Sequence, residues 1–308
     1  MEELTRVFYN APHEIYLEKN IAIYFYITGV SAAFFILSTL AYVFGMERFK
    51  AIGRFSAVLA PIAVAIGPIF LVIDLLQPTR FHHLFYMFNL ASPITWGTIF
   101  LTIYPPICLI YIYSIYKDKA SWAKLFGAIG IPFSIGVHVY AGFLMALSKG
   151  VAFWNTPLMP IYFLASAMVS GTALLILSAI IKEKVFGNNR LINKFFPKIE
   201  NNVIYEISKF LAIFIIIDLF VALSDTLLLF YTTPENLIAG QLLLEGEFSS
   251  IFLYVQVLLG MVIPFIVLLI PKLNRSFSVL TIVSILVLVG VWAMRYLTVI
   301  AGQYVPLM

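Results

Sequence analysis

The sequence predicts an all-α integral membrane protein with eight transmembrane helices, and three observations lead to this fold class. Apolar residues make up 62% of the 308 residues and charged residues only 11%, whereas an ordinary soluble domain is about 25% charged. The mean hydropathy is +1.00. The apolar stretches are continuous and do not alternate with polar residues, which favours helices over the strands of a membrane barrel.

Eight segments of the sequence are long and apolar enough to cross a membrane. A helix needs about 20 predominantly apolar residues to span a hydrocarbon core of ~30 Å. The segments that meet this requirement are 21–45, 55–77, 93–116, 124–147, 157–181, 207–232, 248–270 and 276–301. Each is expected to be helical throughout, because lipid offers no hydrogen-bond partner to a free backbone group.

Lysine and arginine are distributed unequally between the two sides of the membrane. The connections 1–2, 3–4, 5–6 and 7–8 carry most of them: Arg48, Lys50, Arg54, Lys117, Lys119, Lys124, Lys182, Lys184, Arg190, Lys194, Lys198, Lys209, Lys272 and Arg275. The opposite side carries Arg6, Lys19, Arg80 and Lys149. By the positive-inside rule both termini should lie outside. The total of 19 basic against 15 acidic residues does not indicate nucleic-acid binding.

Strongly polar side chains gather in the predicted outer half of the membrane, apart from Asp218 near mid-depth. The set comprises Asp74, His138, Tyr140, Asp218, Asp225, Gln256 and Arg295. Ionisable groups at such depths are costly and usually functional. One interpretation is that they pair with one another, for example Asp225 with Arg295, and hold helices together. The other is a polar cavity that opens outward, in which Asp218, Asp225, Gln256 and Arg295 are candidates for proton transfer.

The sequence lacks the ligands of the common redox cofactors. Cys108 is its only cysteine, so neither an internal disulfide nor an iron–sulfur cluster held by its own thiolates is expected. Of the histidines His13, His82, His83 and His138, only the last lies deep in a predicted span. A b-type haem held by paired histidines is therefore not expected, and no metal site is predicted.

The segment from Asp74 to Gly97, DLLQPTRFHHLFYMFNLASPITWG, resembles the signature of the NrfD and polysulfide-reductase family of membrane subunits. That signature has an acidic residue at the end of helix 2, a Pro-x-Arg-Phe turn, and Ser-Pro-x-x-Trp-Gly at the start of helix 3. The matching residues are Asp74, Pro78, Arg80, Phe81, Ser92, Pro93, Trp96 and Gly97. Residues 24–31, 140–171 and 295–303 are also similar to the family, so the resemblance covers essentially the whole sequence.

The resemblance implies two four-helix bundles and a quinone site near the outer face. The parts would be an outer N-terminal segment (1–20), a first bundle (21–147), an outer loop (148–156) and a second bundle (157–308). Tyr140 corresponds to the family's quinone-contacting tyrosine, and Asp74 would take or relay a proton. Asn20 and Tyr24 would complete the quinone site, with menaquinone or ubiquinone as a diffusible substrate. Gly136 lies one helical turn before Tyr140 on the same face, so we expect it to leave a gap for the flat quinone ring.

The resemblance also implies partners, because a protein without its own redox centre passes no electrons onward alone and is not catalytically complete by itself. A four-cluster iron–sulfur subunit would carry electrons to a molybdopterin catalytic subunit. It would dock on the outer face at Arg80, His82, His83, Trp96 and Trp154. The expected location is the cytoplasmic membrane of a prokaryote, among membrane lipids.

Two other functions remain open from the residues. A secondary transporter would use Asp218, Asp225 and Arg295 as an ion pathway and would have interrupted helices, which Gly67-Pro68 and the segment Gly260 to Pro264 suggest. A purely structural anchor would dock a partner without binding quinone.

Overall fold

The computed structural model describes residues 17–75, 77–148 and 150–304, and within them it confirms eight helices long and apolar enough to cross a membrane. In sequence order they are α2 (Lys19–Tyr42), α3 (Lys50–Ile73), α4 (Pro93–Tyr116), α5 (Ala120–Ala146), α6 (Met159–Phe186), α8 (Asn201–Tyr231), η3 with α10 (Ser250–Val262 and Ile263–Leu269) and α12 (Phe277–Ile300). The predicted segments differ from these bounds by a few residues. Arg6, His13 and Lys149 lie outside the described residues.

Short helices occupy the connections. They are η1 (Glu47–Phe49), η2 (Pro78–Phe85), α7 (Arg190–Phe195), α9 (Pro234–Leu244) and α11 (Pro271–Asn274), and a further short helix, η4 (Ala301–Tyr304), follows α12. The sequence predicted none of them. The N-cap of α9 shows the local cause, because the Thr233 hydroxyl accepts a hydrogen bond from the Asn236 backbone N–H at 3.3 Å.

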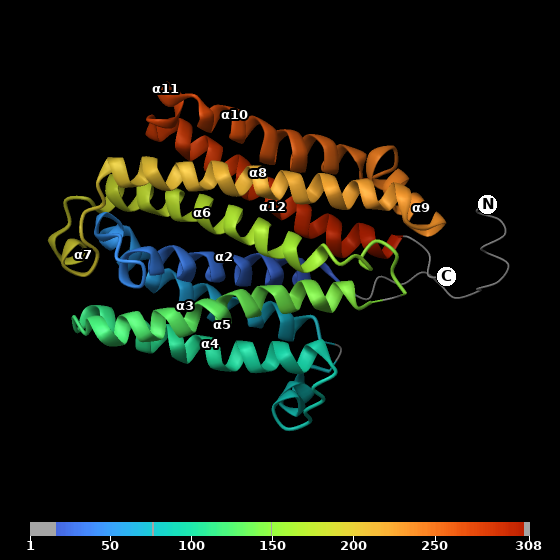
Figure 1. Cartoon of the computed structure of the whole chain (residues 1–308), viewed down its shortest axis with the longest axis horizontal. Helices are drawn as coiled ribbons and strands as arrows, with labels where there is room; N and C mark the ends of the chain where they lie inside the picture. Colours follow the sequence, from blue (N-terminus) through green and yellow to red (C-terminus); the bar gives the residue numbers. More distant parts are fainter. Residues whose placement is uncertain (1–16, 76, 149, 305–308) are drawn as a thin grey trace.

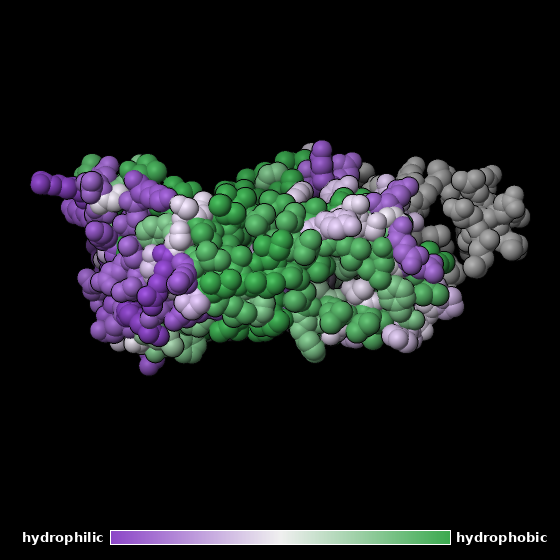
Figure 2. Space-filling view, turned by 90° about the horizontal axis from the view of Figure 1, so that it is seen from above, coloured by the Kyte–Doolittle hydropathy of each residue, from purple (hydrophilic) through white to green (hydrophobic). Residues whose placement is uncertain are grey.

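Helices α2 and α6 lie in the middle of the molecule and the other long helices surround them (Figure 1). Their apolar stretches are 78% and 67% buried, whereas those of the other six are 33–44% buried. We call the end that carries η1, α7 and α11 the basic end, and the end where α2 begins and α12 stops the terminal end. In Figure 2 an apolar band separates a strongly hydrophilic basic end from a mixed terminal end.

The seventh crossing is unusual, because its first 13 residues, Ser250–Val262, form a π-helix. Long π-helices are rare, and shorter π segments are often found at functional sites. The predicted interruption near Gly260 to Pro264 is therefore a change from π-helix to α-helix within a continuous crossing. At Gly260 the backbone touches that of Gly290 in α12, so neither position has room for a Cβ. Gly67 and Pro68, by contrast, do not interrupt α3.

A buried ion pair stabilises the connection between helices at the basic end. Lys182 Nζ lies 2.6 Å from Glu183 Oε1, with the side chains 5% and 11% exposed. Lys182 also donates to the Pro197 carbonyl at 3.1 Å, and the Ile199 backbone N–H donates to Glu183 at 2.9 Å. These bonds tie the connection between α7 and α8 to the end of α6.

Candidate functional site

Tyr140 is packed between three helices at the terminal end. It lies six residues before the end of α5, roughly 9 Å from it along the helix axis. Its hydroxyl is hydrogen-bonded to the hydroxyl of Tyr24 in α2, and its ring lies against Gly97 in α4, where any Cβ would overlap the ring. Both tyrosines are buried. The glycine that ends the Ser-Pro-x-x-Trp-Gly motif therefore leaves space for the Tyr140 ring.

The expected gap beside Gly136 is absent. A Cβ on Gly136 would meet the ring of Phe100 at 2.6 Å, so the aromatic ring of α4 already fills that space. Sequence spacing shows that a glycine lies one turn from Tyr140, but it does not show which neighbouring side chain fills the space.

Asp74 and Asn20 lie at the same end as the two tyrosines. Asp74 is the C-cap of α3, and its Oδ1 is buried without a hydrogen-bond partner. Partial burial raises the pKa of Asp74 above its usual range, and the nearby Glu18 charge adds to the effect, while Asn20 opposes it. The structure thus brings Asp74, Asn20, Tyr24 and Tyr140 to one end of the first four long helices.

Arg295 forms the centre of a separate buried polar cluster. Its Nη2 donates to His138 Nε2 at 2.8 Å, to the Phe163 carbonyl at 2.9 Å and to Ser166 Oγ at 2.7 Å. His138 of α5 therefore makes a hydrogen bond between two helices, to Arg295 of α12. Arg295 also interacts electrostatically with Asp218, but these two side chains form no ion pair, and both Asp218 oxygens are buried without hydrogen-bond partners. The suggested pairing of Arg295 with Asp225 is not seen.

Asp225 instead belongs with Gln256 and Tyr162. Gln256 Nε2 donates to the Tyr162 hydroxyl at 2.6 Å, and both line a cavity of about 20 Å³ together with Asp225, whose Oδ1 is buried without a hydrogen-bond partner. That volume holds about one water molecule. It is much smaller than the open polar cavity expected here. Tyr162 was missed because tyrosines are common at membrane interfaces and its sequence neighbours are apolar.

The docking residues predicted from the sequence separate into two groups. Arg80 and His82 are exposed on η2, which projects from the terminal end beside α4 (Figure 1). The neighbouring His83 ring lies 4.6 Å from the His82 ring. Trp96 is 44% exposed.

Trp154 cannot form part of a docking surface. Only 5% of it is exposed, and its Nε1 donates to the Thr298 carbonyl at 2.5 Å. Gly302 leaves the space that its ring occupies. Trp154 thus fixes the loop between α5 and α6 to α12 and does not face a partner.

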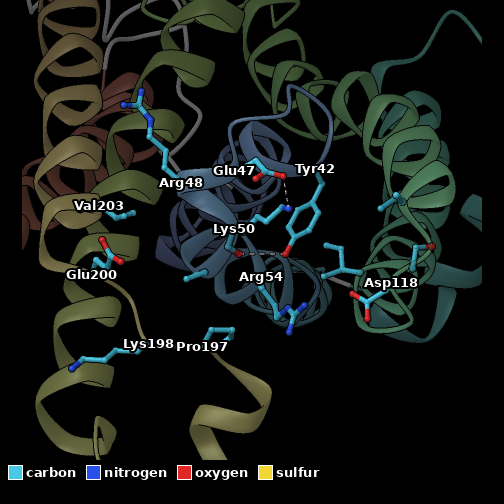
Figure 3. Close-up of a pocket in the computed structure, with 15 residues that line it drawn as sticks. Tyr42, Glu47, Arg48, Lys50, Arg54, Asp118, Pro197, Lys198, Glu200 and Val203 are labelled. Atoms are coloured by element: carbon cyan, nitrogen blue, oxygen red, sulfur yellow. Dashed lines mark hydrogen bonds and ion pairs between the residues drawn. The ribbon is translucent and has the colours of Figure 1, made fainter.

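The larger hollows lie at the basic end, away from these polar groups. One, of about 630 Å³, lies between residues 42–54, Asp118 and the segment 197–203. Figure 3 shows that its charges are mixed, with Lys50 bonded to Glu47 at 2.7 Å. A second, of about 740 Å³, lies between α8 and α10.

Comparison with known proteins places these features in a family. The family model for polysulphide reductase, NrfD, matches residues 10–306. A subunit of the selenate reductase of Mesobacillus selenatarsenatis is 27% identical over 93% of the present sequence and 74% of that protein. A component of the polysulfide reductase of Wolinella succinogenes is 26% identical over 92% of the present sequence and 93% of that protein. The Hdr-like menaquinol oxidoreductase integral membrane subunit of Archaeoglobus fulgidus is 24% identical over 91% of the present sequence and 69% of that protein.

The match of the family model extends over nearly the whole length, and it includes the Asp74–Gly97 signature. This multi-pass membrane protein therefore belongs to the NrfD polysulphide reductase family.

Proposed function

We propose that this protein is the quinone-reactive membrane subunit of a multi-subunit oxidoreductase, with its quinone site at the terminal end. The observation that carries the proposal is the hydrogen-bonded pair of Tyr24 and Tyr140 in the same region as Asp74. The names of the relatives support it, since one is a menaquinol oxidoreductase subunit and two belong to reductases.

The residues fit the chemistry that a quinone head requires. Its carbonyl oxygens need hydrogen-bond donors, and either tyrosine hydroxyl can donate once the pair opens. Asp74 can accept or release a proton, and its unpartnered Oδ1 is available for one. The quinone, when bound, would itself carry the electrons and protons that are exchanged with the membrane quinone pool. Because Phe100 fills the space next to Gly136, a ring must displace Phe100 or the Tyr140 side chain to enter.

The exposed surface of η2 and the segment that follows it fits an extramembrane partner. Phe85, Met87, Phe88 and Leu90 are 49–65% exposed on one short segment, and an exposed apolar patch of this kind usually marks an interaction site. We assign it to an iron–sulfur subunit that passes electrons to a molybdopterin subunit. Crosslinks from such a partner should reach residues 78–92, and crosslinks to residues 182–205 instead would contradict this placement.

The proposed orientation puts the terminal end and both termini outside a prokaryotic cytoplasmic membrane, with the helices grouped as two four-helix bundles. It is supported by the basic residues of the opposite end. Reporter fusions after residue 50 and after residue 190 should both report the cytoplasm. An outside signal from either fusion would contradict the orientation.

Ion translocation is a second candidate function, and the buried polar residues favour it. Asp218, Asp225, Gln256 and Arg295 are all at most 6% exposed, and the first two carry carboxylate oxygens without hydrogen-bond partners. They would transfer protons across the second half of the molecule. A quinone-linked complex that generates no proton gradient in sealed vesicles would exclude this role.

The quinone site is tested by removing one hydroxyl. Tyr140→Phe removes the hydroxyl that would donate to a quinone carbonyl and should cost about 1 kcal/mol of quinone affinity, which corresponds to a roughly fivefold higher KM for quinol. Tyr111→Phe is the matched control, because it removes a buried tyrosine hydroxyl that bonds Ser38 of α2 at 3.0 Å, near the basic end. Assembly should survive in both variants. If Tyr140→Phe assembles and turns over like the parent, the assignment of Tyr140 is wrong.

A further inference from the structure

The hollow between α8 and α10 at the basic end has two chemically different parts. Its deeper walls are apolar and come from α8 (Ala212, Ile213, Ile216) and from α10 (Phe265, Leu268, Leu269). Its mouth at the basic end carries Lys209 and Arg275, which are both exposed. We call this hollow the α8–α10 groove.

The groove exists because the seventh crossing stops early. Ile270 has an extended backbone (φ −86°, ψ 109°) and precedes Pro271, and a residue before proline is driven out of the α-helical region. The short α11 then turns aside, which leaves a gap beside α8 on the side where α10 would otherwise continue. The side chain of Asn274 fixes the floor, since it accepts a hydrogen bond from Ser208 and donates to the Leu268 carbonyl at 3.2 Å.

The mouth of the groove is positively charged. Glu206 is the one acidic side chain among the lining residues that the structure describes, and it is bonded to Arg48 at 3.1 Å. Lys209 and Arg275 make no ion pair with any residue in the described part of the protein. The hollow shown in Figure 3 differs, because Glu47 and Asp118 offset its basic residues.

The depth of the two parts matches a lipid molecule. Lys209 and Ile216 are seven residues apart on α8, about 10 Å along the helix axis. The charged mouth thus lies at the basic end, and the apolar walls extend from it toward the middle of the molecule. Basic pockets between transmembrane helices on one face of the bilayer are a recurrent site for anionic lipid headgroups.

We propose that the α8–α10 groove binds one anionic phospholipid, with its phosphodiester between Lys209 and Arg275 and an acyl tail along Ile213, Ile216 and Leu269. A free phosphate would satisfy the two cations but leave the apolar walls uncovered. A phosphatidylcholine would cover the walls, but its headgroup carries a cation of its own. The lipid would fill the space between α8 and α10 without taking part in quinone chemistry.

The test uses the full-length protein in detergent after delipidation, with binding followed by native mass spectrometry. Dioleoyl phosphatidylglycerol should bind on the order of tenfold to thirtyfold more tightly to the parent than to the Lys209→Gln/Arg275→Gln variant. Dioleoyl phosphatidylcholine should bind both proteins equally and weakly. The matched control is Arg190→Gln/Lys194→Gln, which removes two exposed charges from α7 at the same end and should leave phosphatidylglycerol binding unchanged.

Three results would overturn the proposal. The first is equal binding of phosphatidylglycerol to the parent and to the Lys209→Gln/Arg275→Gln variant. The second is binding of glycerol phosphate or inorganic phosphate to the parent as tight as that of phosphatidylglycerol, which would indicate a headgroup site without a lipid. The third is a dimer of the protein that depends on Lys209 and Arg275, which would indicate that a second copy covers the groove.

Discussion

Arg295 and Asp218 offer the sharpest test of the buried polar cluster. Arg295 is 1% exposed and Asp218 0%, so neither charge is screened by water. Arg295→Met removes the guanidinium, which acts electrostatically on Asp218 although these two side chains form no ion pair. Its Nη2 makes three buried hydrogen bonds, and a hydrogen bond to a charged group contributes about 1.5–3 kcal/mol, so we expect the free energy of unfolding to fall by about 3 kcal/mol or more.

The loss of free energy of unfolding caused by Arg295→Met has two parts. Arg295→Met also deletes the Nη2 bonds to His138, Ser166 and the Phe163 carbonyl, and this loss persists whatever stands at position 218. The electrostatic part disappears when Asp218→Asn is added. The double variant should therefore be more stable than the sum of the single effects predicts, by about 0.5–3 kcal/mol.

Unfolding in mixed micelles with rising denaturing detergent, followed by circular dichroism, measures these differences. Arg295→Met/Asp225→Asn is the control, because Asp225 lies with Tyr162 and Gln256 and not with Arg295; its effects should add. If the effects of Arg295→Met and Asp218→Asn on the free energy of unfolding simply add, the two side chains do not interact electrostatically. Coupling to Asp225 instead would refute the arrangement described above.

Three further predictions follow from other contacts. Gly290→Ala places a methyl group against the Gly260 backbone and should cost about 1–3 kcal/mol of stability. Val289→Ala should cost little, because Val289 in α12 is 47% exposed. Equal effects of the two substitutions would contradict the close approach of the two glycines. Glu183→Ala removes the acceptor of Lys182 and of the Ile199 N–H, so limited trypsin digestion should cut faster at Lys198, while Lys184→Gln should not change that rate. The raised pKa of Asp74 means that the folded protein disfavours the ionised carboxylate, so stability is lost as pH rises through the folded-state pKa. Asp74→Asn should therefore raise the melting temperature at pH 8 but not below about pH 4, where the carboxyl is protonated in both states. An equal shift of the melting temperature at both pH values would contradict the reasoning.

Much of the fold follows from local sequence. The need to satisfy every backbone group in lipid makes each long apolar stretch a helix, so composition and length sufficed to predict eight crossings to within a few residues. Motif spacing also located Tyr140, Asp74 and Arg80 at one end, because the positions of residues along successive crossings determine their depth.

The tertiary structure decided which side chains meet. The depth of a residue along a helix can be predicted from the sequence, but the rotation of the helix and its neighbours cannot. Arg295 is therefore bonded to His138, while Asp225 lies beside Tyr162 and Gln256. Phe100 filled the space beside Gly136 for the same reason. Trp154 became a buried contact because Gly302 left space for its ring. Contacts between helices depend on how side chains from distant segments interlock, and no pattern within a single segment records that.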